Sequence, residues 1–234
     1  MKDLKKRMTQ LENDITELCK NLKRRPEEIL KLIVTKKAPI QDIEELYRLG
    51  YYNFGENYIQ NLLFKQKSLQ QFSMIKWHMI GKLQSNKIKY LKNDFITMLH
   101  SLDSVSLALK LSSFFFKDKE RQTPLLVLIQ IKLDHSSEDK TGTDFHEAKK
   151  IIEIISQNPK LQFRGFMAIG PKSDKRTLDL LYKDFIKNAS SIVSAENVKN
   201  PIISLGMTRD YPSAIQAGST CIRVGSRIFD LEVR

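Results

Sequence analysis

The sequence predicts an α/β protein, a single (β/α)8 TIM barrel with an extra N-terminal helix. Eight apolar segments with strand character alternate with helical patterns along the chain. The length of 234 residues suits a barrel that forms one domain, and no stretch has the composition of a linker. An open doubly wound sheet is the structural alternative, but it would usually have fewer strands or a clearer break. We therefore expect residues 1–234 to form a single domain.

The first expected element is an amphipathic helix over residues 1–25, which ends near Pro26. Its apolar residues recur at steps of three and four, and this spacing places them on one face of a helix. They are Leu4, Met8, Leu11, Ile15, Leu18 and Leu22. The stripe predicts that this helix packs on the barrel.

The first half of the chain then predicts four strands, each followed by a helix. Gly50 stands in the position that glycine favours just past a helix end. The expected strands are residues 31–35, 51–54, 77–80 and 95–102, and the helices are residues 39–49, a segment from about 57, residues 85–91 and a segment from 104 to about 115.

The second half shows the alternation more clearly. Residues 124–133 are apolar almost throughout, as expected for a parallel strand that is buried on both faces. A polar loop over residues 134–142 follows. The other expected strands are residues 161–169, 202–205 and 221–224, and the helices are residues 144–156, about 174–194 and about 211–217.

The composition excludes several classes of protein. The net charge is +12, from 39 Lys and Arg against 27 Asp and Glu, but the lysines are spread over nearly every helix. A nucleic-acid-binding protein would concentrate them on one face, so we expect a solvated surface and no specific nucleic-acid partner. The longest aliphatic run, residues 125–129, is too short to span a membrane.

The two cysteines and the N-terminus favour a cytoplasmic protein. Cys19 and Cys221 match no metal or redox spacing, which indicates free buried thiols in a reducing compartment. The N-terminus alternates charged with apolar residues and lacks a signal-peptide core. Because no histidine has a partner at metal-ligand spacing, we expect no metal.

The last two expected strands end in small residues that can bind a phosphate. The first ends in a hydroxyl and a glycine, in the segment Ser204-Leu205-Gly206, and the second runs into Gly225 and Ser226. Backbone N–H groups at such ends bind phosphates, and barrels often bind them in the loops after strands seven and eight. Arg223 interrupts the last apolar strand and, at period two, faces the same side as Gly225. It would meet the group to which the phosphate is attached.

A lysine follows the first barrel strand. Leu32 and Val34 share one face of that strand, and Lys36 continues this face into the barrel mouth while Lys37 points away. A lysine that is desolvated beside another cation, such as Arg223, becomes nucleophilic toward carbonyl groups and can form a Schiff base. A solvent-exposed lysine of a lysine-rich surface is the alternative.

Two further strand ends carry candidate ligand residues. Asn57 offers an amide that both donates and accepts, which suits a phenolate or aldehyde-derived oxygen on a ring. His78 could stack on a ligand or bond to it, although a histidine beside Trp77 is more often a core residue. Met167 is a core residue by default.

A phosphate cradle, an arginine at a ring edge, a lysine that can form an imine and a nearby amide together describe a pyridoxal 5′-phosphate (PLP) site. The usual handles of PLP are a lysine Schiff base and an Asp or Arg at the pyridine nitrogen. A fixed cation at that nitrogen disfavours its protonation. The ring would then be a weak electron sink, and broad carbanion chemistry would be restrained.

The chain resembles the PLP homeostasis proteins, the YggS or PROSC family, which look like the N-terminal barrel of alanine racemase standing alone. The resemblance runs from about residue 33 to residue 229. It rests on the ordered blocks IVTKKAP, FGENYIQN, WHMIGKLQSNK, HSLDS, LIQIKLD, EDKTG, RGFMAIG and SLGMTRDYPSAIQAGSTCIRVGSRIF. It implies a fold type III PLP barrel and a monomer.

The resemblance also implies roles for individual residues. Lys36 is the Schiff-base lysine and Arg223 faces the pyridine nitrogen. The residues implied at the phosphate are Ser204, Gly225 and Ser226, with Met207 and Asn57 nearby. The chain departs from the common family pattern at Thr35, Lys37, Ser226, Asp230 and the segment Thr208-Arg209-Asp210, which keeps a hydroxyl and adds a cation.

The resemblance implies a noncatalytic protein that stores, buffers or delivers PLP, with PLP-dependent apoenzymes as transient partners. An amino-acid racemase is the alternative. Racemization by two bases needs an acid or base opposite the lysine, which alanine racemase supplies as a tyrosine from a second domain. This chain stops at Arg234 without such a domain, and Tyr58 is a candidate substitute. A phosphosugar enzyme would leave Lys36 and Arg223 unexplained.

Overall fold

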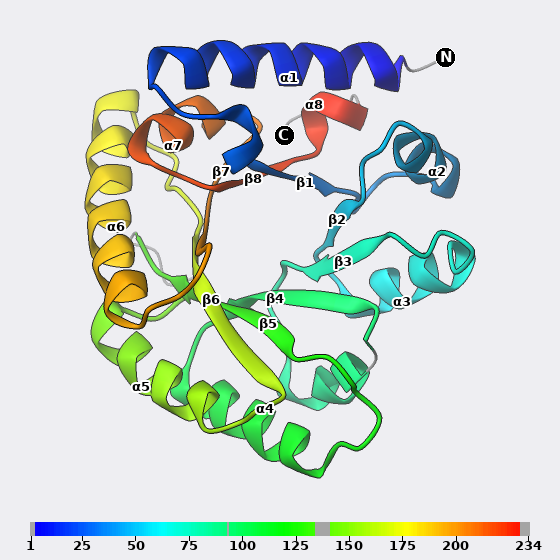
Figure 1. The fold of residues 1–234 in the computed structure, drawn as a ribbon, viewed down its shortest axis with the longest axis vertical. Coiled ribbons are helices and arrows are strands. Elements are labelled where there is room, and N and C mark those ends of the chain that lie inside the picture. The colour runs from blue at the N-terminus through cyan, green and yellow to red at the C-terminus, as the bar shows by residue number, and fades with distance from the viewer. Residues whose placement is uncertain (1–2, 93, 134–140, 230–234) are drawn as a thin grey trace.

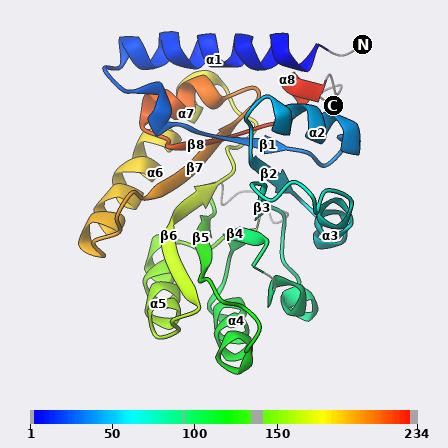
Figure 2. The same cartoon turned by 45° about the vertical axis from the view of Figure 1, so that its right-hand side comes forward.

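The computed structural model of the protein, which describes residues 3–92, 94–133 and 141–229, contains a closed barrel of eight parallel strands. Each strand pairs with the next, and β8 closes the barrel on β1 through the register Leu30↔Cys221. The helices surround the strands, and α1 crosses one side of the barrel (Figures 1 and 2). The predicted (β/α)8 barrel is therefore confirmed.

The elements follow the predicted order. The strands are β1 (Leu30–Val34), β2 (Asn53–Glu56), β3 (Lys76–Met79), β4 (Ile96–Leu102), β5 (Leu125–Ile131), β6 (Leu161–Ala168), β7 (Ile202–Met207) and β8 (Cys221–Val224). The helices are α1 (Leu4–Asn21), α2 (Ile40–Arg48), α3 (Ile59–Ser68), α4 (Val105–Lys117), α5 (Phe145–Ser156), α6 (Lys175–Ala195), α7 (Tyr211–Ala217) and α8 (Ser226–Phe229), with 3-10 turns η1 (Pro26–Glu28) and η2 (Ser85–Lys92). Seven residues of the polar loop expected over 134–142, and the C-terminal residues 230–234, lie outside the described residues.

Three helical elements differ from the prediction. The helix α1 ends at Asn21, since Lys23 takes a φ of 54°, and Pro26 then opens a separate 3-10 turn. The segment η2 is a 3-10 helix and not an α-helix. The short helix α8 was not predicted at all.

The strand β7 is longer than predicted, because it continues through a bulge to Met207. Its register with β8 shifts between Ser204 and Met207, and Gly206 has a φ of +95°. A Cβ atom on Gly206 would lie 2.6 Å from the Cβ of Ala214, so only glycine lets α7 pack here. Ser204 is consequently an internal residue of the strand and not its last one.

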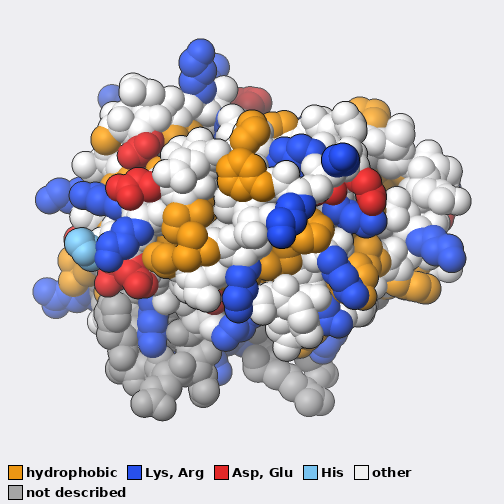
Figure 3. Space-filling model, turned by 90° about the horizontal axis from the view of Figure 1, so that it is seen from below, with side chains coloured by type: hydrophobic (Ala, Val, Ile, Leu, Met, Phe, Trp, Pro, Cys, Tyr) orange, Lys and Arg blue, Asp and Glu red, His pale blue; other side chains and the backbone are white. Residues whose placement is uncertain are grey.

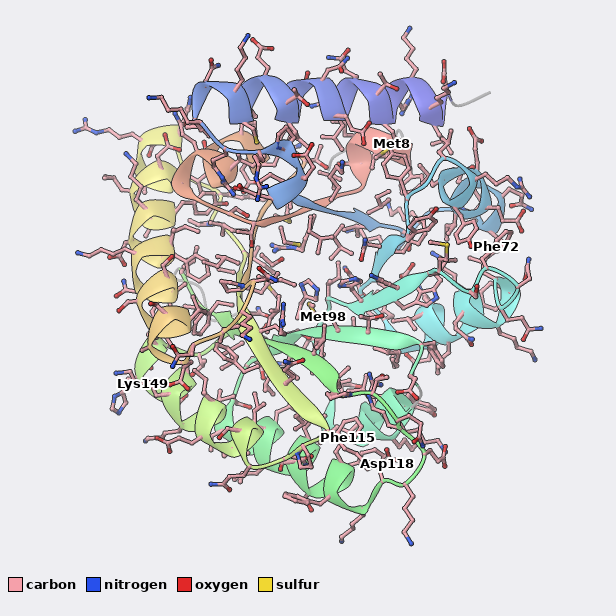
Figure 4. All side chains as sticks on the ribbon, in the orientation of Figure 1. Met8, Phe72, Met98, Phe115, Asp118 and Lys149 are labelled. Carbon is pink, nitrogen blue, oxygen red and sulfur yellow. The ribbon has the colours of Figure 1, made fainter. Side chains whose placement is uncertain are left out.

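The N-terminal helix α1 packs on α7, α8 and α2. Its buried residues are Leu4, Met8, Leu11, Ile15 and Cys19, and Figure 4 shows Met8 on the side that faces the barrel. Asp14 on α1 forms an ion pair with Arg227 on α8. Beyond the helix, Arg24 donates to the carbonyl oxygens of Ile215 and Ser219, both at 2.9 Å. The helix is thus joined to the last part of the barrel by apolar and polar contacts.

The apolar core has two parts. The larger part lies between the strands and the surrounding helices, where Phe115 of α4 is fully buried (Figure 4). The smaller part lies inside the barrel and consists of Met98, Leu128 and Met167. The exposed side chain of Lys149 on α5 points away from both. The assignment of Met167 to the core is confirmed.

Two histidines form a buried pair inside the barrel. The Nδ1 atom of His78 lies 2.9 Å from Nε2 of His100, and its Nε2 lies 3.2 Å from Oδ1 of Asn53. Burial lowers the pKa of His78 to about 3 and holds the pKa of His100 well below 6.5, with a further contribution from neighbouring charges. Both imidazoles are therefore neutral in the folded protein at neutral pH.

This pair predicts a loss of stability in mild acid. Below pH 6.5 the unfolded histidines bind protons that the buried ones exclude, so the free energy of unfolding should fall as the pH drops. At pH 5 the loss should be about 2 kcal/mol for each imidazole. Urea unfolding between pH 7.5 and 5 measures it. A flat profile would contradict neutral buried imidazoles.

The surface charge is dispersed. Figure 3 shows Lys and Arg side chains scattered over one face, interrupted by acidic and apolar side chains. No helix within the described ranges is long and apolar enough to cross a membrane. In the same part of the chain, no three His, Cys, Asp or Glu side chains gather to form a metal site.

Candidate functional site

A cavity of about 1550 Å³ opens at the carboxyl ends of the strands, where barrel proteins carry their functional sites. Its walls come from the segments that follow β1, β2, β3, β6, β7 and β8. The predicted site residues that line it are Lys36, Asn57, Met207, Arg223, Gly225 and Ser226. Ser204 and His78 do not line it.

Lys36 and Lys37 are the two central residues of a turn that follows β1. The N–H of Ala38 donates to the carbonyl oxygen of Thr35 at 2.7 Å, which closes the turn. Both lysines are exposed and both line the cavity. The expectation that Lys37 points away is wrong, because the chain leaves the alternation of the strand after Val34. The desolvation expected for Lys36 is not observed either.

Arg223 is held rigidly in the wall of the cavity. It is only 5% exposed, and its guanidinium donates to the carbonyl oxygen (2.8 Å) and the hydroxyl (2.7 Å) of Ser204 and to the carbonyl oxygen of Ala168 (2.8 Å). Burial lowers the pKa of this arginine below its usual value. Among the described residues, no carboxylate lies within ion-pair distance of it. The cavity therefore contains a fixed cation whose hydrogen bonds all go to neutral oxygens.

Ser204 supports Arg223 and does not face the phosphate end of the cavity. This differs from the predicted role, because the bulge in β7 carries the strand past Ser204 and leaves its side chain fully buried. Thr208, directly after β7, supplies the hydroxyl at the cavity instead. The sequence signal for Thr208 was its place in the segment Thr208-Arg209-Asp210, but the underestimated length of β7 concealed its role.

The end of the cavity that the sequence analysis assigned to a phosphate is formed by the loops after β7 and β8. Met207 and Thr208 line it from the first loop, and Gly225 and Ser226 from the second. The N–H of Gly225 lies 3.5 Å from the hydroxyl oxygen of Thr208, which brings the two loops together. Ser226 begins α8, and the first N–H groups of a helix have no partner within it. Hydroxyl and backbone donors thus converge at this end.

The loop after β7 is anchored by Asp210. Its Oδ1 accepts from the N–H of Met207 at 2.6 Å, and its Oδ2 accepts from the hydroxyl of Tyr182 on α6. Burial and this hydrogen bond raise the pKa of Tyr182. A Cβ atom on Gly170 would lie 2.1 Å from the same hydroxyl, so the loop after β6 packs directly on it. Two loops that line the cavity are therefore fixed to each other.

Gly225 permits the close approach of β8 to β1. A Cβ atom on it would lie 2.7 Å from the carbonyl oxygen of Val34. Gly225→Ala should therefore lower the free energy of unfolding by about 1–3 kcal/mol. Gly55→Ala is the matched control, because its Cβ would meet the flexible end of Ile80 at 3.2 Å. Urea unfolding compares the two variants, and an equal cost would contradict the close contact.

Asn57 and His78 occupy different depths of the barrel. Asn57 follows β2 and lines the cavity, and Gly81 packs so closely on its backbone that a Cβ atom there would lie 2.0 Å from the carbonyl oxygen of Asn57. His78 lies one level lower, opposite Gly55, with both ring nitrogens engaged by His100 and Asn53. His78 is thus the core residue that was the alternative, and it is left out of the candidate ligand set.

Basic side chains outnumber acidic ones around the cavity. The basic ones are Lys36, Lys37, Lys82, Lys172, Lys175, Arg209 and Arg223, and the acidic ones are Asp174 and Asp210. Each of the two acids already accepts two hydrogen bonds, Asp174 from Thr177 and Asp210 from Tyr182 and Met207. Such a lining attracts an anionic ligand.

Comparison with known proteins identifies the family of this chain. The profile of the family described as "Alanine racemase, N-terminal domain" matches residues 16–232. The chain belongs to this family. Within the alanine racemase N-terminal domain family, it is 35% identical over 231 residues to the pyridoxal phosphate homeostasis protein of Pasteurella multocida, covering 97% of this chain and 96% of that protein. The predicted resemblance to PLP homeostasis proteins is confirmed.

Two solved structures of the family extend the comparison. PipY of Synechococcus elongatus, solved with PLP bound, has a TM-score of 0.77 and 29% sequence identity, covering 92% of this chain and 99% of PipY. Alanine racemase of Clostridium difficile has a TM-score of 0.73 at 13% identity, covering 98% of this chain and 56% of the racemase. The racemase likeness concerns the fold alone.

Proposed function

We propose that the protein binds PLP and acts in PLP homeostasis by storing, buffering or delivering the cofactor. The observation that carries this proposal is Arg223, a buried cation with no carboxylate within ion-pair distance among the described residues, which faces the same cavity as Lys36. A phosphate site alone would not need a cation held in this way. The names of the relatives and the PLP in PipY support the same conclusion.

The residues of the cavity fit the parts of PLP. Lys36 would hold the aldehyde carbon as a Schiff base, and Arg223 would face the pyridine nitrogen. The phosphate would be bound by the loops after β7 and β8, through Thr208, Gly225 and Ser226, with Met207 beside it. Asn57 would bond to a ring oxygen. Bound PLP supplies an electron sink, and the cation of Arg223 weakens that sink because it opposes protonation of the nitrogen.

We infer that the protein is a carrier and not an enzyme. Its relatives are named as homeostasis proteins. The racemase alternative needs an acid or base opposite Lys36. Tyr58, the candidate for this role, is 65% exposed, and no tyrosine is among the described residues that line the cavity. Exchange of the α-proton of alanine for deuterium tests this directly, because rapid exchange that depends on Lys36 would contradict a carrier.

Reduction with borohydride tests the proposed binding. The protein is purified with PLP, its visible absorption is recorded, and it is then reduced, digested and mapped by mass spectrometry. The expected result is a pyridoxyl group on the peptide that contains Lys36, with fragmentation assigning it to that residue. The absence of an adduct, or an adduct on Lys37 alone, would overturn the assignment.

The proposal also includes the cellular compartment, the oligomeric state and the partners of the protein. Cys19 and Cys221 are buried free thiols, which supports a reducing cytoplasm. We predict that the protein is a monomer and that it passes PLP to apoenzymes in transient contacts. Gel filtration of the PLP-loaded protein, with and without a PLP-dependent apoenzyme, tests both points.

A further inference from the structure

A buried ion pair lies directly behind the candidate site. Glu56, the last residue of β2, is fully buried, and Lys65 of α3 is 7% exposed. The Nζ atom of Lys65 lies 2.6 Å from Oε1 of Glu56. Neither residue lines the cavity. The proposed function leaves this pair without a role.

The pair is bonded to the residue that precedes Lys36. The ammonium of Lys65 also donates to the carbonyl oxygen of Thr35 at 2.5 Å, and the hydroxyl of Thr35 donates to Oε1 of Glu56 at 2.6 Å. Thr35, Glu56 and Lys65 thus form a closed set of three contacts, which we call the Thr35–Glu56–Lys65 triad. It connects the end of β1, the end of β2 and the helix α3.

The triad fixes the turn that carries Lys36. The carbonyl oxygen of Thr35 accepts from the N–H of Ala38 as well as from Lys65, so the first residue of the turn is held from two sides. The N–H of Thr35 donates to the carbonyl oxygen of Gly55 at 3.0 Å. The start of the turn therefore cannot move without breaking contacts to β2 and α3.

Stability alone does not account for the triad. A buried ion pair is often no more stabilising than a well-packed apolar pair of the same volume, because desolvation of both charges offsets their attraction. In the part of the chain that the structure describes, Oε2 of Glu56 has no hydrogen-bond donor. The charged pair forms directional hydrogen bonds between two adjacent strand ends. An apolar pair would not form them.

We propose that the Thr35–Glu56–Lys65 triad positions Lys36 and Asn57 for PLP, which rests on the proposed function. Lys36 follows Thr35 and Asn57 follows Glu56, so the triad joins the residues that immediately precede two candidate ligands. Holding both in the bound geometry before PLP arrives reduces the ordering cost of binding. The three residues are positioning residues, since none of them lines the cavity.

The sharpest test compares two substitutions at Thr35. Thr35→Val keeps the shape but removes the hydroxyl that bonds to Glu56, whereas Thr35→Ser keeps it. The dissociation constant for PLP, measured by visible absorption, should rise about 3- to 10-fold in Thr35→Val, which corresponds to the loss of one hydrogen bond. The midpoint of the pH titration of the visible absorption of bound PLP should also shift in Thr35→Val. In Thr35→Ser, the dissociation constant and this pH midpoint should equal those of the unsubstituted protein.

A second test removes both buried charges together. In Glu56→Gln/Lys65→Met, we expect PLP to bind about tenfold more weakly while the far-ultraviolet circular dichroism stays native. The matched control is Glu120→Gln/Lys92→Met, which removes an exposed ion pair with a comparable Nζ–Oε1 distance of 2.8 Å. This control should bind PLP normally. If the first double variant does not fold, the comparison of Thr35→Val with Thr35→Ser decides whether the triad positions the ligand residues.

The outcomes separate this inference from the proposed function. If the unsubstituted protein gives no pyridoxyl adduct, the proposed function fails and this inference fails with it. If it binds PLP, and Thr35→Val shows the same dissociation constant and the same pH midpoint, the triad has no positioning role and the proposed function stands. Weaker binding in Thr35→Val that Thr35→Ser does not restore would also overturn the positioning role.

Discussion

Replacing Lys36 with alanine should abolish the covalent attachment of PLP, while Lys37→Ala should preserve it. The two lysines are adjacent in one turn, both are exposed and both line the cavity, so they form a matched pair. The proposed function assigns the Schiff base to Lys36 and not to Lys37. The contrast between the variants therefore reports which amine reacts and not a general effect of positive charge.

The measurement has two parts. The visible absorption of a Schiff base should be absent from Lys36→Ala, and borohydride should leave no adduct on it. The remaining affinity, measured by competition or calorimetry, should be at least about tenfold weaker, the equivalent of 1.4 kcal/mol. Loss of the adduct in Lys37→Ala with retention in Lys36→Ala would reverse the assignment of the two residues.

Replacing Arg223 with methionine should both destabilise the protein and impair PLP binding. The change leaves three buried acceptors without their donor: the hydroxyl and carbonyl oxygens of Ser204 and the carbonyl oxygen of Ala168. The free energy of unfolding should fall by roughly 2–4 kcal/mol. The cavity also loses the cation assigned to the pyridine nitrogen, which should weaken binding even in the folded variant.

Arg121→Met is the control that separates these two effects. Arg121 is 2% exposed and donates to the carbonyl oxygens of Leu91, Ile96 and Thr123, but it lies at the opposite end of the barrel. Its replacement should lower the free energy of unfolding by about as much as Arg223→Met does. PLP affinity, measured at a temperature where both variants are folded, should fall in Arg223→Met only. An equal affinity in the two variants would remove Arg223 from the site.

The sequence was most informative where a single strand pattern decides the outcome. Arg223 was placed on the inner face of the last strand by its period with Gly225, and it lies there. There, alternation along the strand sets the direction of the side chain, and a neighbouring element does not change it. Lys36 also lies at the cavity, but in a turn beyond the end of β1, where the alternation no longer applies and where the same argument was wrong for Lys37.

The errors arose where tertiary contacts override a local pattern. Ser204 was read as a strand end, but the bulge at Gly206 extends β7 to Met207, so that Thr208 and not Ser204 brings a hydroxyl to the cavity. His78 was predicted to bind the cofactor, but its ring is buried below the cavity, and this depth depends on pairing with β2, which a single sequence does not reveal. The Thr35–Glu56–Lys65 triad was missed because its members belong to three elements that only the fold brings together.

The packing of α1 has a consequence for how the protein folds during synthesis. This helix is made before the barrel strands, yet Asp14 pairs with Arg227, 213 residues later, and Arg7 donates to the carbonyl oxygen of Ile228. Of the helices on which α1 packs, α2 is made early, but α7 and α8 are made last, so part of its apolar face has no native surface to cover until they have emerged. Loop closure over such a separation is slow. The helix α1 consequently completes its native contacts only after β8 and α8 have been made.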